Sequence, residues 1–251
     1  MAGILTSHSG LRPEAKRYVM AGRGVVVDAG GRGDFTVIQD AVDYMTARAS
    51  GGRIWIREGE YIEAVTVEVA NIIIEGASWD TIINGSDVQH ALDLKSTATL
   101  AGITNIQIKT PAGGGNAYNA VVLRGVGNWM SHVHIPESDS NGIVFVADYC
   151  WIEGCDILDC DSDGVVFQGT FCRAENCRAV GAAGDGFAID HVVGTSSMVV
   201  GCVMYDSTQY GVHIWTGAEN CVVVGNRATN NSAGEIYDES GTSTVVGNDT
   251  D

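Results

Sequence analysis

Residues 141–145 read Asn141-Gly142-Ile143-Val144-Phe145, and related phrases recur three times further along the chain. They are Asp163-Gly164-Val165-Val166-Phe167, Asp185-Gly186-Phe187-Ala188-Ile189 and Tyr210-Gly211-Val212-His213-Ile214, with glycines spaced 22, 22 and 25 residues apart. Apolar residues alternate within each phrase, and this period of two is typical of strands. A short strand repeated at such a period indicates a solenoid, in which every coil packs on its neighbours.

A second phrase lies between copies of the first and repeats in step with it. Its members are Ile152-Glu153-Gly154-Cys155, Ala174-Glu175-Asn176-Cys177, Val199-Val200-Gly201-Cys202, Val223-Val224-Gly225-Asn226 and Val245-Val246-Gly247-Asn248. Two strands per period, separated by residues that tolerate positive φ, predict an all-β parallel solenoid. Leucine-rich repeats have a similar period, but their spaced leucine frame is absent here.

The composition fits one domain of short strands joined by tight turns. The chain has 251 residues, 33 glycines and only 3 prolines, and this length suffices for one sizeable core. The net charge is −17, with three lysines (Lys16, Lys95 and Lys109) against 31 acidic residues. Nucleic acid is therefore not expected as a partner, because phosphate binding needs basic patches. A lysine-poor acidic surface favours a halophilic origin, since salt screens the self-repulsion.

The seven cysteines are predicted to be buried free thiols. Cys155, Cys177 and Cys202 recur at one position of the repeat, and Cys150 and Cys172 at another. Stacked coils about 4.8 Å apart would bring some pairs within disulfide reach. The odd number of cysteines and the absence of a recognisable signal peptide favour free thiols instead. No apolar run approaches about 18 residues, so no membrane-spanning segment is expected.

The amino-terminal part divides into an arm and the start of the β-helix domain. Residues 1–23 are mixed and polar and are predicted to form an arm, while residues 24–251 form the domain. A helix is expected at about 35–49, capped by Asp34 and ended by Gly51-Gly52. Such a helix would cover the open end of the first coil, whose unpaired strand edges otherwise invite aggregation.

The first coils resemble a known superfamily. The resemblance rests on four stretches: Gly33-Asp34-Phe35-Thr36-Val37-Ile38-Gln39-Asp40-Ala41-Val42, Gly59-Glu60-Tyr61-Ile62-Glu63, Ile74-Glu75-Gly76 and Thr81-Ile82-Ile83-Asn84-Gly85. Together they resemble the amino-terminal coils of pectin-lyase-like β-helix proteins, which include pectin methylesterases and many phage tailspikes. The resemblance implies a single-stranded right-handed parallel β-helix with an amino-terminal capping helix.

The catalytic signatures of that superfamily are not recognisable in this chain. The paired motifs of pectin methylesterase are missing, and Gly184-Asp185-Gly186-Phe187 only faintly resembles one motif of polygalacturonase. No clustered calcium-binding acids with a catalytic arginine, as in pectate lyases, can be identified. The missing signatures favour a non-enzymatic role.

The coil register predicts which side chains point outward. Successive strand residues face opposite sides, so the inward positions Ile143 and Phe145 leave Val144 and Val146 outside. One inward column is predicted to contain Leu92, Val121, Ile143, Val165, Phe187, Val212 and Ile236. The resulting outward apolar patch consists of Val122, Val144, Val146, Val166 and Ala188. An exposed apolar patch usually marks an interface, and the resemblance to phage β-helix proteins implies a homotrimer. The arm of residues 1–23 is the alternative cover.

A polar and aromatic cluster is predicted at the carboxy-terminal end of the same face. It consists of Asp190, His213, Trp215, Glu235, Tyr237 and Asp238. Aromatic rings flanked by carboxylates suit a glycan site, with His213, Trp215, Tyr237 and Asp238 as the binding residues. Asp190 and Glu235 are the catalytic candidates, since two coils place them about 9.6 Å apart, near the separation in inverting glycosidases. The alternative is a solvated sheet end with ordinary cross-strand pairs.

A turn-bound cation is the one cofactor that the sequence suggests. Asp161, Asp163 and Asp185 fall in neighbouring turns, where carboxylates could hold Ca²⁺. The segment from Asp159 to Gly164 matches the first half of an EF-hand loop, but Thr170 stands where that motif requires glutamate. Turn-forming aspartates without an ion are the alternative, and no other cofactor is expected.

These observations favour a structural protein on a virion surface. We expect a tailspike, fibre or turret subunit of a virus with a halophilic host, which binds host polysaccharide and contacts other virion proteins through residues 1–23. The alternative is an extracellular carbohydrate-active enzyme, either a polysaccharide lyase, a hydrolase or an epimerase. A third interpretation is a solenoid without any ligand. Fold analogy alone does not choose among them.

Overall fold

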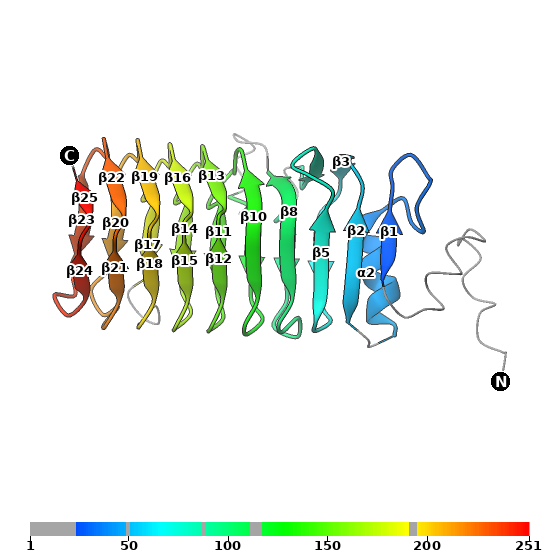
Figure 1. Ribbon diagram of the computed structural model, residues 1–251, viewed down its shortest axis with the longest axis horizontal. Coiled ribbons are helices and arrows are strands. Elements are labelled where there is room, and N and C mark those ends of the chain that lie inside the picture. Colours follow the sequence, from blue (N-terminus) through cyan, green and yellow to red (C-terminus); the bar gives the residue numbers. More distant parts are fainter. Residues whose placement is uncertain (1–23, 49–50, 87–88, 111–116, 191–194, 251) are drawn as a thin grey trace.

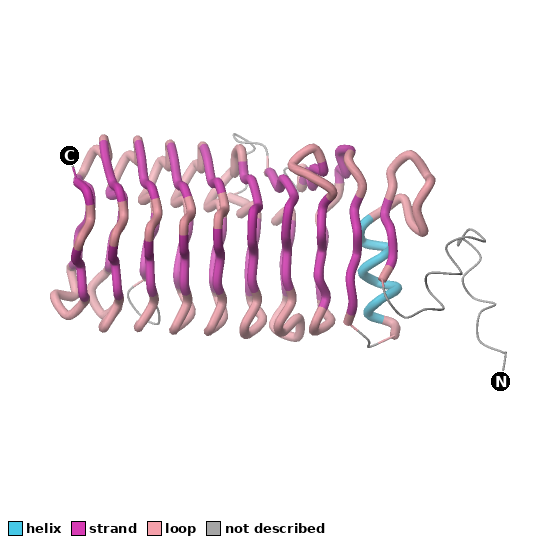
Figure 2. The backbone as a smooth tube through the Cα atoms, in the orientation of Figure 1, coloured by secondary structure: helices cyan, strands magenta, loops and turns pink. Residues whose placement is uncertain are grey.

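The chain winds into an elongated parallel β-solenoid, with its single described helix at the end formed by the earliest strands (Figure 1). The computed structural model describes residues 24–48, 51–86, 89–110, 117–190 and 195–250. The predicted arm, residues 1–23, lies outside the described residues. In the tube view, strands from successive coils line up side by side along the length of the molecule (Figure 2). No helix in the described ranges is long and apolar enough to cross a membrane.

Three columns of parallel strands run along the stack. The first column contains β1 (Val25–Val27), β2 (Gly52–Ile56), β5 (Ile72–Gly76), β8 (Gly102–Lys109), β10 (Trp129–Ile135), β12 (Trp151–Glu153), β15 (Arg173–Glu175), β18 (Met198–Val200), β21 (Val222–Val224) and β24 (Thr244–Val246). The second column contains β3 (Gly59–Ile62), β6 (Thr81–Asn84), β13 (Asp156–Leu158), β16 (Arg178–Val180), β19 (Val203–Tyr205), β22 (Arg227–Thr229) and β25 (Asp249–Thr250). The long strands β8 and β10 pair within both columns and join them into one 17-stranded sheet.

The third column is a separate eight-stranded sheet. It contains β4 (Val65–Val67), β7 (Leu92–Leu94), β9 (Val121–Leu123), β11 (Ile143–Phe145), β14 (Val165–Phe167), β17 (Phe187–Ile189), β20 (Tyr210–Ile214) and β23 (Gly234–Asp238). Because each coil contributes one strand to it, the solenoid has eight coils. Its pairings confirm the predicted inward column from Leu92 through Val121 to Val212 and Ile236.

The core lies inside the three columns and is built from residues that repeat at equivalent positions. Phe145, Phe167 and Phe187 are fully buried, with ring centroids 4.9 and 6.4 Å apart. All seven cysteines are buried and free, which confirms the prediction. Burial raises the pKa of the Cys160 thiol to about 12, so this side chain stays protonated and packs as a small apolar group.

A single left-handed residue makes the sharp bend between the first and second columns in seven successive coils. These residues are Asn105, His132, Gly154, Asn176, Gly201, Gly225 and Gly247, with φ between 51° and 66°. The residue that follows this bend is a buried cysteine in the middle coils and an asparagine in the last two coils. Asn226 accepts from the Cys202 amide at 2.8 Å and donates to the Val199 carbonyl at 2.9 Å. The asparagine thereby satisfies backbone groups that would otherwise be buried without partners.

The helix α2 spans Ile38–Thr46, within the predicted 35–49, but Asp34 does not cap it. The Asp34 carboxylate instead accepts from the Val26 amide. Glu63, which follows β3, accepts from the amides of Ile38 and Gln39 at 2.8 and 2.9 Å. A carboxylate from the neighbouring coil thus satisfies the free amides of the first helical turn, which also favour negative charge. The helix packs on β1, β2 and β4 at the first coil.

The predicted exposed apolar patch is largely absent. Val122, Val144, Val166 and Ala188 point away from the main core and form a cluster of their own, but they are only 1–7% exposed within the single chain. Val146, at 38%, is the one member that meets solvent. Alternation predicted the direction of these side chains correctly, but direction does not determine burial. The expected trimer therefore loses its main support, and the rival cover, residues 1–23, lies outside the described residues.

Candidate functional site

The candidate site lies on the outer face of the eight-stranded sheet, at its carboxy-terminal end. His213 in β20 pairs with Ala188 in β17 and Tyr237 in β23. It therefore continues the outward column that begins with the buried valines, and is itself only 3% exposed. A buried polar ring on the outer face of a sheet requires partners, and two carboxylates supply them.

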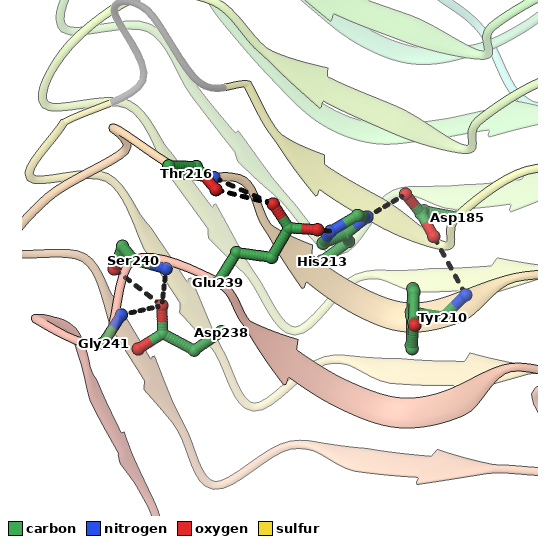
Figure 3. A network of polar contacts seen from close by, with 8 residues as sticks. All are labelled: Asp185, Tyr210, His213, Thr216, Asp238, Glu239, Ser240 and Gly241. Carbon is green, nitrogen blue, oxygen red and sulfur yellow. Dashed lines mark hydrogen bonds and ion pairs between the residues drawn. The ribbon is translucent and has the colours of Figure 1, made fainter.

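His213 is held between a buried and a partly exposed carboxylate (Figure 3). Its Nδ1 lies 3.1 Å from Asp185 Oδ2, and its Nε2 lies 3.2 Å from Glu239 Oε1. The Tyr210 amide donates to the other Asp185 oxygen at 2.9 Å. Thr216 donates to Glu239 through both its amide and its hydroxyl, at 3.3 and 2.8 Å. The network ties three coils together and fixes the imidazole plane.

The network also sets the charge of its members. Burial alone lowers the pKa of His213, but the hydrogen bonds and charges of Asp185 and Glu239 outweigh it, and the net pKa is raised above 6.5. The pKa of Glu239 is lowered, chiefly by the hydrogen bond from Thr216 and also by His213. In its imidazolium form the ring donates from both nitrogens. Both ring nitrogens are engaged by carboxylates, so His213 is held in place and is not a free general base.

Aromatic rings surround the imidazole. Its centroid lies 4.1 Å from that of Trp215, 4.9 Å from that of Tyr210 and 5.5 Å from that of Tyr237. Tyr210 and Tyr237 also stack on each other at 4.9 Å. Trp215 and Tyr237 are 39% and 43% exposed. We call Trp215 and Tyr237 the aromatic platform: two exposed rings supported from beneath by a charged, immobilised histidine.

The structure moves Glu235 away from the position that the sequence predicted. Tyr237, not Glu235, lies beside His213, so Glu235 is in register with the start of β20. Glu235 is displaced from Asp190 by four residues along the strand direction, or roughly 13 Å. It also lies two coils away along the stack. Glu235 accepts instead from the side chain of Asn231. The predicted catalytic pair of Asp190 and Glu235 is therefore not assembled.

Glu239, and not Glu235, is the glutamate that lies beside Trp215 on the outer face. The Trp215 amide bonds to Ile189 and the Glu239 amide to Ile214, so Asp190, Trp215 and Glu239 follow one another along one outward column. Gln168 donates to Asp190 at 3.3 Å from the coil before. Sequence reasoning missed Glu239, although extending the predicted pairing of Val212 with Ile236 by three residues would have found it.

Asp238 was predicted to bind glycan, but its carboxylate faces its own turn. It is in register with the inward residue Ile214 and accepts from the hydroxyl and amide of Ser240 at 2.6 and 3.0 Å (Figure 3). The amides of Gly241 and Ser243 add longer contacts at 3.2 and 3.4 Å. Asp238 thus closes the loop after β23, as aspartates commonly do in turns.

The predicted cation ligands do not converge. Asp163 accepts from the Asp185 amide at 2.7 Å, whereas the Asp185 side chain binds His213 and Tyr210. Asp161 takes part through its backbone amide, which bonds to the Ser138 carbonyl. In the described ranges no group of three or more histidine, cysteine or acidic side chains could hold a metal ion. These aspartates act as turn and network residues in the structure.

Comparisons with known proteins point to one architecture. A family model described as "Right handed beta helix region" matches residues 70–250. A search of curated protein sequences gave no match.

Among solved structures, the pectin methylesterase of Aspergillus niger is 15% identical over 90% of this chain and 85% of its own, with a TM-score of 0.67. The α-1,3-glucanase catalytic unit of Streptomyces thermodiastaticus is 22% identical over 79% of this chain but only 38% of its own, with a TM-score of 0.62. The mannuronan C-5 epimerase A-module of Azotobacter vinelandii is 18% identical over 90% and 73%, with a TM-score of 0.60. Likeness at these identities shows a shared fold and transfers no activity.

Proposed function

Because the chain belongs to the right-handed β-helix family, we propose that it is a carbohydrate-active protein that binds a glycan on the aromatic platform. The observation that carries the proposal is the pairing of exposed Trp215 and Tyr237 with a buried His213 that two carboxylates immobilise. A platform that is already rigid loses little entropy when a ligand binds. The structurally similar proteins reported above are a pectin methylesterase, an α-1,3-glucanase and a mannuronan epimerase, which supports the same class of ligand.

The chemistry of the platform suits a sugar ring. Aromatic side chains offer a large apolar face for the C–H surface of a pyranose. Asp190 and Glu239 lie on either side of Trp215 in the same column and can accept from hydroxyl groups. A site that combines apolar rings with a few placed polar groups is the usual form of a small-ligand site.

The charge of this region favours a neutral glycan over a polyuronate. The arginine and lysine of the same outward face, Arg124 and Lys95, both pair with Asp93 several coils away. At the platform itself, buried Asp185 adds a third carboxylate to Asp190 and Glu239, and His213 is the one basic side chain that the described residues place in ion pairs there. Carboxylated sugars would meet uncompensated negative charge there, since like charges repel strongly at short range.

Binding to a panel of neutral hexose oligosaccharides tests the proposal. Calorimetric titration would use glucohexaoses with α-1,3, α-1,4, β-1,3 and β-1,4 linkages, and oligogalacturonate as the charged comparison. We expect at least one neutral probe to bind, and Trp215→Ala with Tyr237→Ala to weaken that binding at least about tenfold. Tyr205→Thr removes an equally exposed aromatic ring from the second column, where Thr229 is its natural neighbour, and should change nothing. Undiminished binding in the platform variant would refute this assignment.

Glycoside hydrolysis is a second candidate function, favoured by one observation. Asp190 and Glu239 lie two coils apart on either side of Trp215, about 9.6 Å between backbones, close to the separation of the two carboxylates in inverting enzymes. The lowered pKa of Glu239 suits the general base, which leaves Asp190 as the acid. Release of reducing ends from the bound glucan, abolished by Asp190→Asn and by Glu239→Gln, is the expected result. Binding without release would indicate an adhesin.

The virion-surface role and the halophilic origin remain proposals supported by the sequence. The net charge of −17 predicts that unfolding midpoints rise with salt as screening reduces self-repulsion. A trimer with a rigid stalk would sediment at three times the chain mass in high salt. A monomer that is fully stable in dilute buffer would count against both proposals and leave the glycan proposal untouched.

A further inference from the structure

A second aromatic groove lies over β12 and β15 of the first column, and so on a different sheet from the aromatic platform. It has a volume of about 360 Å³ and is lined by the consecutive residues 149–153 of one coil and by Phe171, Arg173 and Glu175 of the next. No residue of the aromatic platform or its network contributes to it. The groove therefore requires an explanation of its own.

One stacked aromatic pair and Trp151 form its apolar side. Tyr149 and Phe171 stack with centroids 5.2 Å apart and planes within 9°, yet are 57% and 53% exposed. Trp129 and Trp151 stack alongside at 5.4 Å and 9°, and Trp151 is 36% exposed. Scattered exposed apolar residues are ordinary on protein surfaces, but a contiguous group around a hollow marks a binding site.

The backbone at Tyr149 and Phe171 makes these aromatic rings unfavourable for the fold itself. Both residues are left-handed, with φ of 58° and 56°, and that conformation costs roughly 1–2 kcal/mol for a residue with a Cβ atom. Backbone hydrogen bonds align them with one residue per coil at the same turn. The aligned residues of the other coils are Asn71, Leu100, Gly127, Ser196 and Asn220, most of them small or polar. Stability alone would favour asparagine or glycine at both positions.

Charged groups also line the groove, beginning with Arg173, which is in register with Trp151. Arg173 forms an ion pair with Glu175, and Glu153 is in register beside Glu175 on the neighbouring strand. Without a bound ligand, two glutamates side by side on one face of a sheet are unfavourable because their charges repel. They offer acceptors, and Arg173 offers donors, within the same hollow as the aromatic rings.

We propose that this groove is a second glycan-binding site that takes neutral hexose residues, separate from the aromatic platform. The C–H face of a pyranose would lie on the Tyr149, Phe171 and Trp151 side, and its hydroxyl groups would meet Glu153, Glu175 and Arg173. An apolar peptide or a second copy of the chain would bury these charges without partners, which is costly. A polyuronate would be repelled by the two glutamates. Two sites on different faces would let one rigid solenoid hold a polysaccharide at two points and gain avidity.

The test replaces the two strained aromatic residues by the residue that other coils use. The double variant Tyr149→Asn with Phe171→Asn introduces asparagine, which Asn71 and Asn220 already supply at the aligned positions of other coils. The fold should therefore tolerate both changes. The variant, the unchanged protein and the Tyr205→Thr control would be titrated with the four glucohexaoses by calorimetry, and quenching of tryptophan fluorescence would report contact with Trp151. We expect the groove variant to lose at least about tenfold in affinity for one class of sites, while the control binds as the unchanged protein does.

The two glycan sites are distinguished by crossing the variants. If the groove binds independently, Trp215→Ala with Tyr237→Ala leaves binding at the groove in place. Only the variant that carries all four substitutions then loses all binding. If the platform variant alone abolishes binding, the groove proposal is wrong and the platform stands. If the groove variant alone abolishes it, the groove stands and the platform proposal is wrong. If no neutral probe binds, the groove proposal is wrong. A concentration-dependent increase in mass that the groove variant removes would also overturn it, and would indicate that the groove is a self-association surface.

Discussion

Two aromatic stacks of this solenoid, one inside and one outside, are built from the same kind of side chain and differ in nearly everything else. Phe145, Phe167 and Phe187 follow one another through the core, fully buried and in edge-to-face or tilted contact, and form what we call the inner stack. Tyr149 and Phe171 stack on the surface, more than half exposed and with a left-handed backbone. Both arise because equivalent residues of successive coils lie about 4.8 Å apart.

The difference shows that repetition aligns side chains but does not give them a role. Inside, alignment removes apolar surface from water and stabilises the fold. Outside, the same alignment leaves most of that surface in water and adds backbone strain. Aromatic residues that do not stabilise the fold, and that line a hollow with charged groups, are better explained by a ligand.

The largest expected effect comes from the inner stack. Phe167→Ala should lower the free energy of unfolding by about 3–5 kcal/mol, because it removes a fully buried ring and leaves a cavity between two coils. Denaturant titration of the purified variant measures it. A loss below about 1 kcal/mol would mean that the coils relax into the space and that the inner stack is not the main source of cohesion.

A second prediction concerns the asparagines that follow the bend in the last two coils. Asn226→Ala should cost about 1–3 kcal/mol, because the Cys202 amide would lose the side-chain acceptor that it has in the buried turn. Asn248→Ala is the matched control, since Asn248 makes the equivalent contact to Val223 in the last coil but is less buried. Equal losses in the two variants would contradict the idea that burial, rather than repetition, determines the cost.

The His213 network extends the comparison to charge. His213→Gln should cost about 1–2 kcal/mol near pH 6, because an amide can replace the contacts but not the positive charge. The raised pKa of His213 means that its contribution is fully present below about pH 6.5 and is lost as pH rises through the raised value. The lowered pKa of Glu239 means that its contribution is present above about pH 4.5 and is lost as pH falls.

The His213–Glu239 pair thus stabilises the fold between the pH at which Glu239 is protonated and the pH at which His213 loses its proton. The free energy of unfolding, determined from pH 3 to 9, measures this window. The unchanged protein and the His213→Gln variant should differ most inside the window and converge at alkaline pH. A difference that does not vary with pH would show that packing of the ring, not its charge, is what matters.

The smallest effect on stability is expected for the outer stack. Phe171→Asn should change the free energy of unfolding by less than about 1 kcal/mol, because relief of the left-handed strain offsets the lost ring contact with Tyr149. Thermal and denaturant unfolding, run beside Phe167→Ala, make the comparison direct. A loss above about 2 kcal/mol would make the outer stack a structural element and remove the reason to assign it to a ligand.

The fold was largely predictable because its determinants are local and repeated. Alternation within each phrase, glycine or asparagine at each bend and the constant period all act within one coil, and the inward column through Ile143 and Val165 is confirmed by the pairing. The helix near the amino terminus was also predicted, but its cap was not. Glu63 supplies that cap from a following coil, and such a contact depends on where two coils meet in space.

The candidate site was predictable as a neighbourhood but not as an arrangement. His213, Trp215 and Tyr237 do gather at the carboxy-terminal end of the outer face. An error of two residues placed Glu235 where Tyr237 lies, although the predicted pairing of Val212 with Ile236 is correct, because the residue before Ile236 was taken as the partner of His213 instead of the residue after it. In a strand, small shifts of register change the level and the face of every side chain.

The sequence by itself determined the all-β parallel solenoid, two of its three repeating strands per coil, the free buried thiols and the acidic composition. Each of these depends on residue type and spacing, which a repeat displays directly. Only the tertiary structure decided that the outward valines are buried, that Asp185 and Glu239 hold His213 between them, and that Tyr149 and Phe171 line a groove. These features depend on distances between side chains of different coils, and such distances exist only once the coils have stacked.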